Sequence, residues 1–115
     1  MNDKPHLDEE ALAELQDVME DEFDVLIRTY INDSIDRIAS IRQALDAGDA
    51  DALVKTAHSF KGSCVNIGAP RLGALCLEVE DAGREQRFNE VTSLMEAIDS
   101  EFRQVRDMLE GFLVG

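Results

Sequence analysis

The sequence lacks tryptophan, has only two prolines, and contains no apolar run of the roughly 20 residues that a helix needs to cross a bilayer. Its start, from Met1 to His6, carries no hydrophobic stretch of the kind that directs secretion. Its two cysteines, Cys64 and Cys76, fit neither a CxxC motif nor a Cys/His metal spacing. We therefore expect a cytoplasmic protein in which both thiols are free and buried on apolar helix faces.

Positive charge is also scarce, because 11 Lys and Arg residues stand against 25 Asp and Glu residues and leave a net charge of −14. Nucleic-acid binding depends on many Lys and Arg contacts, and anionic membranes attract basic segments, so we expect neither partner. No glycine-rich nucleotide loop is present, and neither clustered carboxylates nor Glu-x-x-His pairs predict a metal site. Any phosphate chemistry must therefore use a phosphoryl group that this chain does not itself supply, and we expect no cofactor on this chain.

Apolar residues recur at helical spacing throughout, and no stretch alternates apolar and polar residues as an exposed strand would. At 115 residues the chain fits a single domain, residues 1–115, with residues 1–6 as a flexible tail. Gly48, Gly68 and Pro70 mark helix boundaries, because glycine suits a helix C-terminus and proline suits the first turn of the next helix. The predicted helices cover about residues 8–20, 22–47, 50–67 and 70–85, followed by a long fifth helix with apolar residues between 91 and 112.

Four long amphipathic helices with short connections favour an all-α fold, an antiparallel up-down four-helix bundle with the short N-terminal helix as a cap over one end. We expect this bundle to be a monomer. Each long helix carries one apolar stripe that should be buried. The stripes of the second, third and fourth helices contain Ile27, Ile31, Ser34, Ile38, Ile41 and Leu45, then Leu53, Ala57, Phe60, Cys64 and Ile67, and then Leu72, Leu75, Cys76 and Val79.

His58 lies in a segment, residues 52–77, that contains no Asp or Glu although the whole chain has 25 of them. The same segment carries Lys55, Lys61 and Arg71, so the sign of the charge is locally inverted around one nucleophilic imidazole. Acidic groups would repel an incoming phosphoryl group or anionic partner, whereas these cations would attract it. The segment is therefore a candidate site for phosphate chemistry.

Lys61 and Gly62 follow His58 by three and four positions and so share its helix face, with Lys55 one turn earlier. Gly62 costs a helix up to about 1 kcal/mol relative to alanine, which makes sense where something must approach the imidazole closely. Partner docking should use an apolar patch along this edge, with only modest sensitivity to salt. The residues expected to bind the partner here are Val54, Lys55, Gly62 and Val65.

Glu80 is the expected partner of the imidazole. His58 lies ten residues before Gly68 and Glu80 lies twelve residues after it, so in a helical hairpin the two differ in height by only roughly 3 Å. A carboxylate at that height would accept a hydrogen bond from one ring nitrogen and fix the tautomer. The other nitrogen would then be exposed as the nucleophile.

Each of these residues also has a plainer interpretation. A lone histidine on a bundle is often a boundary residue, the lysines can be ordinary solvated charges, and Gly62 can be a packing contact with a neighbouring helix. The chain would then be an acidic helical adaptor in which His58 is incidental. A small enzyme with His58 as general base is a third interpretation, but the sequence indicates no second catalytic group. His6 has none of these neighbours and is interpreted as a tail residue.

One motif begins with the run Ala57-His58-Ser59-Phe60-Lys61-Gly62-Ser63 and continues through Ile67-Gly68-Ala69, Leu72, Leu75-Cys76, Val79-Glu80 and Gly83-Arg84. Over these roughly thirty residues the chain resembles the histidine-containing phosphotransfer (HPt) domain. The helical plan extends the resemblance to nearly the whole chain. It looks like a free-standing HPt protein rather than a module of a sensor kinase.

The resemblance implies that His58 accepts a phosphoryl group from the aspartyl phosphate of a receiver domain, in a hybrid sensor kinase, and passes it to the aspartate of a response regulator. Lys61 matches the lysine that helps to neutralise the phosphoryl oxygens, and Gly62 matches the small residue that lets the receiver dock. Glu80 falls where many members have a glutamine or a similar hydrogen-bonding side chain. Arg84 closes the motif and is counted among the binding residues.

On this resemblance the chain is a phosphocarrier in a bacterial-type multistep phosphorelay, without independent turnover. The divalent metal of the reaction would belong to the receiver partner. Phe60 departs from the family pattern, where an aliphatic residue is common, and this departure affects packing more than chemistry. Whether His58 becomes covalently phosphorylated separates this function from the adaptor and the small enzyme.

Overall fold

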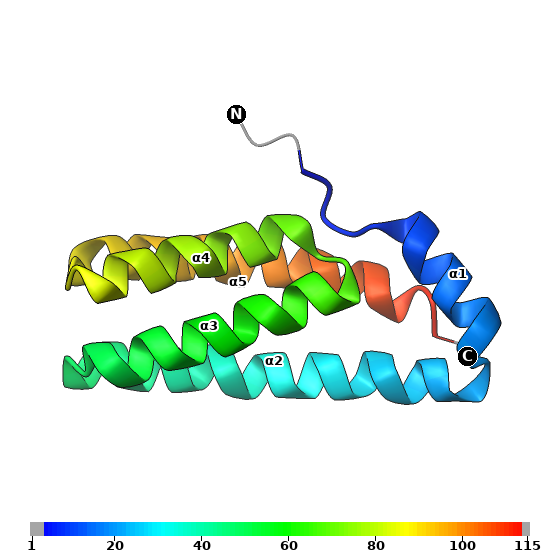
Figure 1. The fold of residues 1–115 in the computed structure, drawn as a ribbon, viewed down its shortest axis with the longest axis horizontal. Coiled ribbons are helices and arrows are strands. Elements are labelled where there is room, and N and C mark those ends of the chain that lie inside the picture. Colours follow the sequence, from blue (N-terminus) through cyan, green and yellow to red (C-terminus); the bar gives the residue numbers. More distant parts are fainter. Residues whose placement is uncertain (1–3, 114–115) are drawn as a thin grey trace.

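A computed structural model describes residues 4–113 of the chain (Figure 1). It contains the helices α1 (Glu9–Met19), α2 (Asp21–Ala47), α3 (Ala50–Ile67), α4 (Pro70–Arg84) and α5 (Phe88–Glu110), and residues 4–113 form no strand. Figure 1 shows α2 to α5 running up and down the long axis, while α1 lies across one end of them, near the start of α2. The predicted all-α bundle with an additional N-terminal helix is therefore confirmed.

The α3–α4 turn, which positions the candidate site, is built from the expected residues. Gly68 has a φ of +85°, in the left-handed region that favours glycine. The backbone N–H groups of Gly68 and Ala69 both donate to the carbonyl oxygen of Cys64, which satisfies the open end of α3. Pro70 stands in the first turn of α4, where its missing N–H costs nothing. These local preferences make the chain reverse at the point that the sequence predicts.

The core lies between the four long helices. The apolar stripes predicted for α2, α3 and α4 are buried, except that Leu45 and Leu75 at their margins are only half-buried. Burying such a side chain contributes about 1.5–3 kcal/mol, so these stripes hold the bundle together. At the end covered by α1, the rings of Phe23 and Phe112 meet edge to face with centroids 6.1 Å apart. The largest fully buried side chains are Phe23, Phe60, Leu12, Ile27, Ile41, Leu53, Leu72, Met95, Ile98 and Leu109.

Both cysteines are buried and free, as expected. The Tyr30 hydroxyl lies 3.3 Å from Sγ of Cys64, inside the core. Burial raises the pKa of Tyr30 well above its ordinary value, so the hydroxyl stays neutral. This buried contact gives the tyrosine hydroxyl a polar partner.

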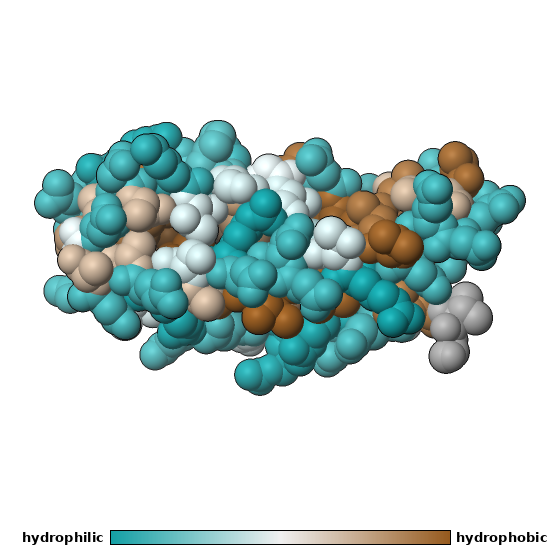
Figure 2. Space-filling view, turned by 90° about the horizontal axis from the view of Figure 1, so that it is seen from below, coloured by the Kyte–Doolittle hydropathy of each residue, from teal (hydrophilic) through white to brown (hydrophobic). Residues whose placement is uncertain are grey.

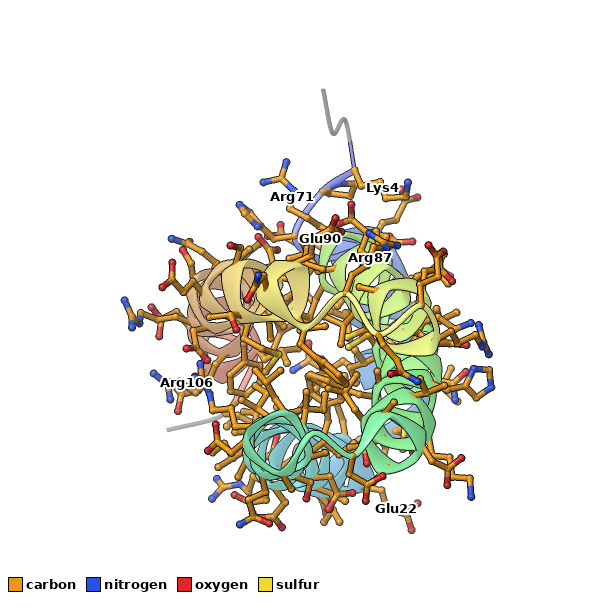
Figure 3. All side chains as sticks on the ribbon, turned by 90° about the vertical axis from the view of Figure 1, so that its left-hand side faces the viewer. Lys4, Glu22, Arg71, Arg87, Glu90 and Arg106 are labelled. Carbon is orange, nitrogen blue, oxygen red and sulfur yellow. The ribbon has the colours of Figure 1, made fainter. Side chains whose placement is uncertain are left out.

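The segment before α1 is held against the α4 and α5 side of the bundle. Nε of Arg71 donates to the carbonyl oxygen of Lys4 at 3.1 Å, and Figure 3 shows these two residues together on one side. Nδ1 of His6 lies 2.6 Å from Oε2 of Glu101, whose side chain is only 8% exposed. Sequence reasoning did not anticipate this partner for His6. Residues 1–3 of the expected tail lie outside the described residues, and the flexibility of residues 4–6 stays a prediction.

Most charged side chains point outward around the bundle, as the view along its axis shows (Figure 3), while Glu80 and Glu101 are buried. Within residues 4–113, no helix combines the length and the apolar character that a membrane span requires. Apolar residues nevertheless reach the surface. On the face seen in Figure 2 they gather mainly toward the end at which α1 lies. The exposed large apolar residues include Val18, Val25, Ile35, Val65 and Leu77.

Candidate functional site

The α3–α4 pair, which is the most extensive helix contact in the fold, depends on a glycine of α4. A Cβ placed on Gly83 would lie 2.6 Å from Cδ2 of Leu53 and 3.0 Å from Cγ2 of Val54, both on α3. Real carbon contacts are optimal at about 3.5–4.0 Å, so no side chain fits at this position without movement. Gly83 therefore lets α4 approach α3 closely and brings the neighbouring residues Glu80 and Arg84 to the edge of α3.

His58 and Glu80 meet across this helix pair. Nδ1 of His58 lies 3.2 Å from Oε1 of Glu80. The imidazole side chain is 64% exposed, whereas the carboxylate is only 3% exposed. The contact expected from the matched heights of the two residues is therefore present, with the carboxylate beneath an accessible ring. Its role in chemistry stays a prediction.

Three basic side chains surround the Glu80 carboxylate. Besides His58, Nη2 of Arg84 lies 2.5 Å from Oε2, and Nζ of Lys61 lies 3.9 Å from Oε1. Burial alone would raise the pKa of Glu80, but the hydrogen bond from His58 and the charge of Arg84 outweigh it and hold the pKa below its ordinary value. Glu80 is therefore ionised at neutral pH.

This charge state assigns the proton between the two side chains. An ionised carboxylate only accepts hydrogen bonds, so the proton of the His58–Glu80 contact belongs to Nδ1. In a neutral imidazole the second nitrogen, Nε2, then carries the lone pair. Nε2 of His58 is thus available as a nucleophile on an exposed ring, while Nδ1 donates a hydrogen bond to the buried Glu80 carboxylate.

Gly62 lies in open space. No atom outside its own helix would come within 4 Å of a Cβ added there. The interpretation of Gly62 as a packing contact is therefore wrong, and the glycine leaves a gap on the surface one turn after His58. This gap is compatible with the close approach of another protein.

The gap continues into an open hollow between α3 and α2, of about 480 Å³. Sequence reasoning located only the α3 side of this surface, because the sequence alone does not reveal which residues of α2 lie beside α3. Leu26 and Thr29 of α2 also border a second hollow that reaches Met19 at the end of α1. The hollow between α2 and α3 is lined by Leu26, Thr29, Tyr30, Asp33, Arg37, Ser59, Gly62, Ser63, Asn66 and Ile67.

The remaining expected binding residues differ in their accessibility. Val65 is 63% exposed, whereas Val54 is half-buried and turns its Cγ2 toward Gly83 of α4. Nζ of Lys55 lies 3.0 Å from Oδ2 of Asp51, an acid just outside the acid-free segment. Both of these side chains are more than 70% exposed, so their attraction is weak. Of the expected set, Lys55 and Val65 are exposed. Gly62 is half-buried, with open space where a side chain would stand.

Arg84 has a structural role that the motif alone did not indicate. It lies four residues after Glu80 on α4, the spacing at which helical side chains pair, and it also reaches within 3.7 Å of Asp81. This spacing was the available signal for the Arg84–Glu80 pair. The spatial role of Gly83 had a weaker signal, a glycine inside a predicted helix. Among residues 4–113 no group of three or more His, Cys, Asp or Glu residues is placed to hold a metal ion.

Comparisons with known proteins agree on one family. A family model described as "Hpt domain" matches residues 25–112. Histidine-containing phosphotransfer protein 4 of Arabidopsis thaliana is 31% identical over 112 residues, which cover 93% of this chain and 88% of that protein. The crystal structure of histidine-containing phosphotransfer protein B (HptB) from Pseudomonas aeruginosa PAO1 matches with a TM-score of 0.88 and 46% identity, covering 93% of each chain.

Proposed function

This chain belongs to the Hpt-domain family and is a phosphocarrier of phosphorelays, and we propose that the residue carrying the phosphoryl group is His58. The observation that supports this assignment most strongly is the 3.2 Å contact between Nδ1 of His58 and the buried Glu80 carboxylate. It holds an accessible imidazole in the tautomer whose Nε2 can attack phosphorus. The alternative of an acidic adaptor with an incidental His58 finds no support in the comparisons.

The proposed reaction is an in-line displacement at phosphorus. The Nε2 lone pair of His58 forms the N–P bond while the P–O bond to a receiver's aspartate breaks, and the bonding electrons leave with the aspartate carboxylate. The proton on Nδ1 stays in place, so the ring becomes cationic beside Glu80. Catalysis of this kind depends mostly on positioning and on neutralising the phosphoryl charge. Lys61, one turn from His58, is the proposed cation for the phosphoryl oxygens.

The receiver is proposed to dock over the hollow between α2 and α3. Gly62 provides the gap beside His58, and the exposed Val65 provides an apolar contact on the same face. Transient interfaces are typically apolar at the centre and charged at the rim, which suits this surface in an acidic protein. Val54 and Lys55 lie at the opposite end of the same edge and are proposed as rim contacts, together with Arg84.

The proposed partners are the receiver domains of a hybrid sensor kinase and of a response regulator, and the proposed compartment is the cytoplasm. The chain acts as a monomer and turns over only together with these receivers. The divalent metal is assigned to the receiver, and this chain needs no cofactor of its own.

The assignment is tested by incubating the protein with a phosphorylated receiver and mapping the acid-labile label. His58→Gln should abolish the label while the helical content stays unchanged. The chain offers a matched control, because His6 is its only other histidine and also pairs with a buried carboxylate. His6→Gln should keep full labelling. Label that persists in His58→Gln would overturn the assignment.

A further inference from the structure

The negative charge of Glu80 calls for an explanation that its hydrogen bond does not supply. A neutral amide could accept the same bond from Nδ1 of His58 and orient the ring equally well. A carboxylate that is 3% exposed instead requires compensation for lost hydration, which His58, Lys61 and Arg84 provide together. Several residues around the ring therefore stabilise the negative charge of Glu80. This charge should matter most when His58 is phosphorylated.

In that state, the proton on Nδ1 decides how easily the phosphoryl group leaves. When Nδ1 carries a proton, breaking the N–P bond returns the electron pair to Nε2 and releases a neutral imidazole. When Nδ1 has lost its proton, the same step releases an imidazolate anion, which is a far poorer leaving group. An adjacent carboxylate favours the cationic ring over the deprotonated one, because opposite charges at hydrogen-bond distance stabilise each other.

We propose that Glu80 sets the lifetime of the phosphohistidine by keeping the proton on Nδ1 while the phosphoryl group is on Nε2. This inference rests on the proposed function, because it requires His58 to be the carrier. In the transfer step the receiver's aspartate oxygen attacks phosphorus, the N–P bond breaks, and the neutral ring keeps its Nδ1 proton. Glu80 acts through the ring and does not touch phosphorus, so it is a positioning residue that also controls charge.

The charges around Glu80 should let its attraction for the Nδ1 proton become stronger when His58 is phosphorylated. Lys61 is 29% exposed and its Nζ lies 3.9 Å from Glu80, so it is the cation held least tightly by the carboxylate. A phosphoryl group on Nε2 offers Lys61 two further negative charges. If Lys61 turns to that group, the carboxylate keeps Arg84 and the imidazolium as its partners. On α4, Asp81 contacts Arg84 from the solvent side.

Two charged groups of α3 complete the surroundings of the ring. Lys55, one turn before His58, is paired with the exposed Asp51. Both side chains are more than 70% exposed, so solvent screens their effect on the ring. The decisive charge on Nδ1 is therefore that of Glu80.

The experiment measures hydrolysis of the phosphohistidine without any receiver. Wild-type protein and Glu80→Gln are phosphorylated with phosphoramidate, freed of the reagent, and followed by phosphorus NMR between pH 5 and 10. Water then replaces the ring at phosphorus and inorganic phosphate is released. The label becomes long-lived above the pH at which Nδ1 loses its proton. Glu80→Gln removes one opposite charge at hydrogen-bond distance, which should lower this pH by about one unit. At pH 8 the label should therefore decay about tenfold more slowly in Glu80→Gln than in wild type.

Two further variants separate charge from structure. Glu101→Gln removes the other buried carboxylate that pairs with a histidine, and it should keep the wild-type pH profile. Glu80→Ala removes both the charge and the hydrogen bond, and it should resemble Glu80→Gln. Equal profiles for wild type and Glu80→Gln would overturn the proposal, even if Glu80→Ala differs, because the hydrogen bond alone would then matter. Failure to label His58 in wild type would instead contradict the proposed function.

Discussion

The close packing of Gly83 against α3 should make this position intolerant of any side chain. In Gly83→Ala the added Cβ would lie 2.6 Å from Cδ2 of Leu53 and 3.0 Å from Cγ2 of Val54. Carbon atoms prefer separations of about 3.5–4.0 Å, so α4 or Leu53 must shift by about 1 Å. Leu53 is fully buried and has little room to turn away. We therefore expect the variant to push α3 and α4 apart.

The magnitude follows from two opposing effects. Overpacking of this kind costs about 1–3 kcal/mol, whereas replacing glycine by alanine in a helix gains about 1 kcal/mol. Gly83→Ala should therefore lose up to about 2 kcal/mol of unfolding free energy. Gly62→Ala is the control, because it adds the same methyl group to a helical glycine and no atom of a neighbouring helix lies within 4 Å of the new Cβ. Gly83 lies in the last turn of α4, where the helical gain is smaller, so the difference between the two variants reports mainly the packing cost of about 1–3 kcal/mol.

Urea unfolding followed by circular dichroism measures this difference directly. Gly62→Ala should be more stable than wild type and Gly83→Ala less stable or unchanged. Nitrogen NMR of the imidazole provides a second measurement, because separating the helices should weaken the contact between His58 and Glu80. If Gly83→Ala proves as stable as Gly62→Ala and leaves the imidazole signals unchanged, the close α3–α4 approach is not the basis of the site.

Three other predictions concern the site and its surroundings. Lys61→Ala should slow phosphotransfer roughly tenfold or more, since a charge-assisted contact is worth about 1.5–3 kcal/mol. It should cost little stability, because Lys61 is the cation held least tightly by Glu80. Gly62→Gln should obstruct receiver docking while slightly favouring the helix. Parental transfer rates for both variants in stopped-flow assays would contradict the docking arrangement. Val65→Glu should weaken receiver binding more than Glu14→Lys in α1, as titration calorimetry can rank. The pKa of Glu80 is lowered from an ordinary value of 4.5, so its stabilising contribution is present above that pH and is lost as the pH falls through the folded value. The difference in unfolding free energy between wild type and Glu80→Gln should shrink below pH 4.5, and a difference that grows there would show that the sign is wrong.

The helices and the His58–Glu80 contact could be predicted because their signals are local or periodic. Apolar spacing defined the buried stripes, and Gly68 with Pro70 defined the turn. Once the turn was placed, the rise of a helix gave both side chains their heights. Simple geometry then brought together two residues that lie 22 positions apart.

Other features depend on how the helices pack, which a sequence does not state. Which residues of α2 line the hollow depends on the rotation of α2 about its own axis. Both Gly62 and Gly83 are glycines within predicted helices, and only the structure shows that Gly83 faces Leu53 and Val54 whereas Gly62 faces open space. The contact of His6 with Glu101 joins residues 95 positions apart, and neither residue belongs to a recognisable pattern. Val54, which was expected on the same edge as Gly62 and Val65, is half-buried, and its Cγ2 lies toward Gly83 of α4.

The central claim is that the phosphoryl group resides on Nε2 of His58. The most direct test is long-range proton–nitrogen NMR of nitrogen-15-labelled protein before and after phosphorylation by a receiver. The account predicts that only the Nε2 signal of His58 takes on the character of a phosphorylated nitrogen, with Nδ1 still protonated and His6 unchanged. Phosphorylation at Nδ1 of His58, or on any other residue, would contradict it.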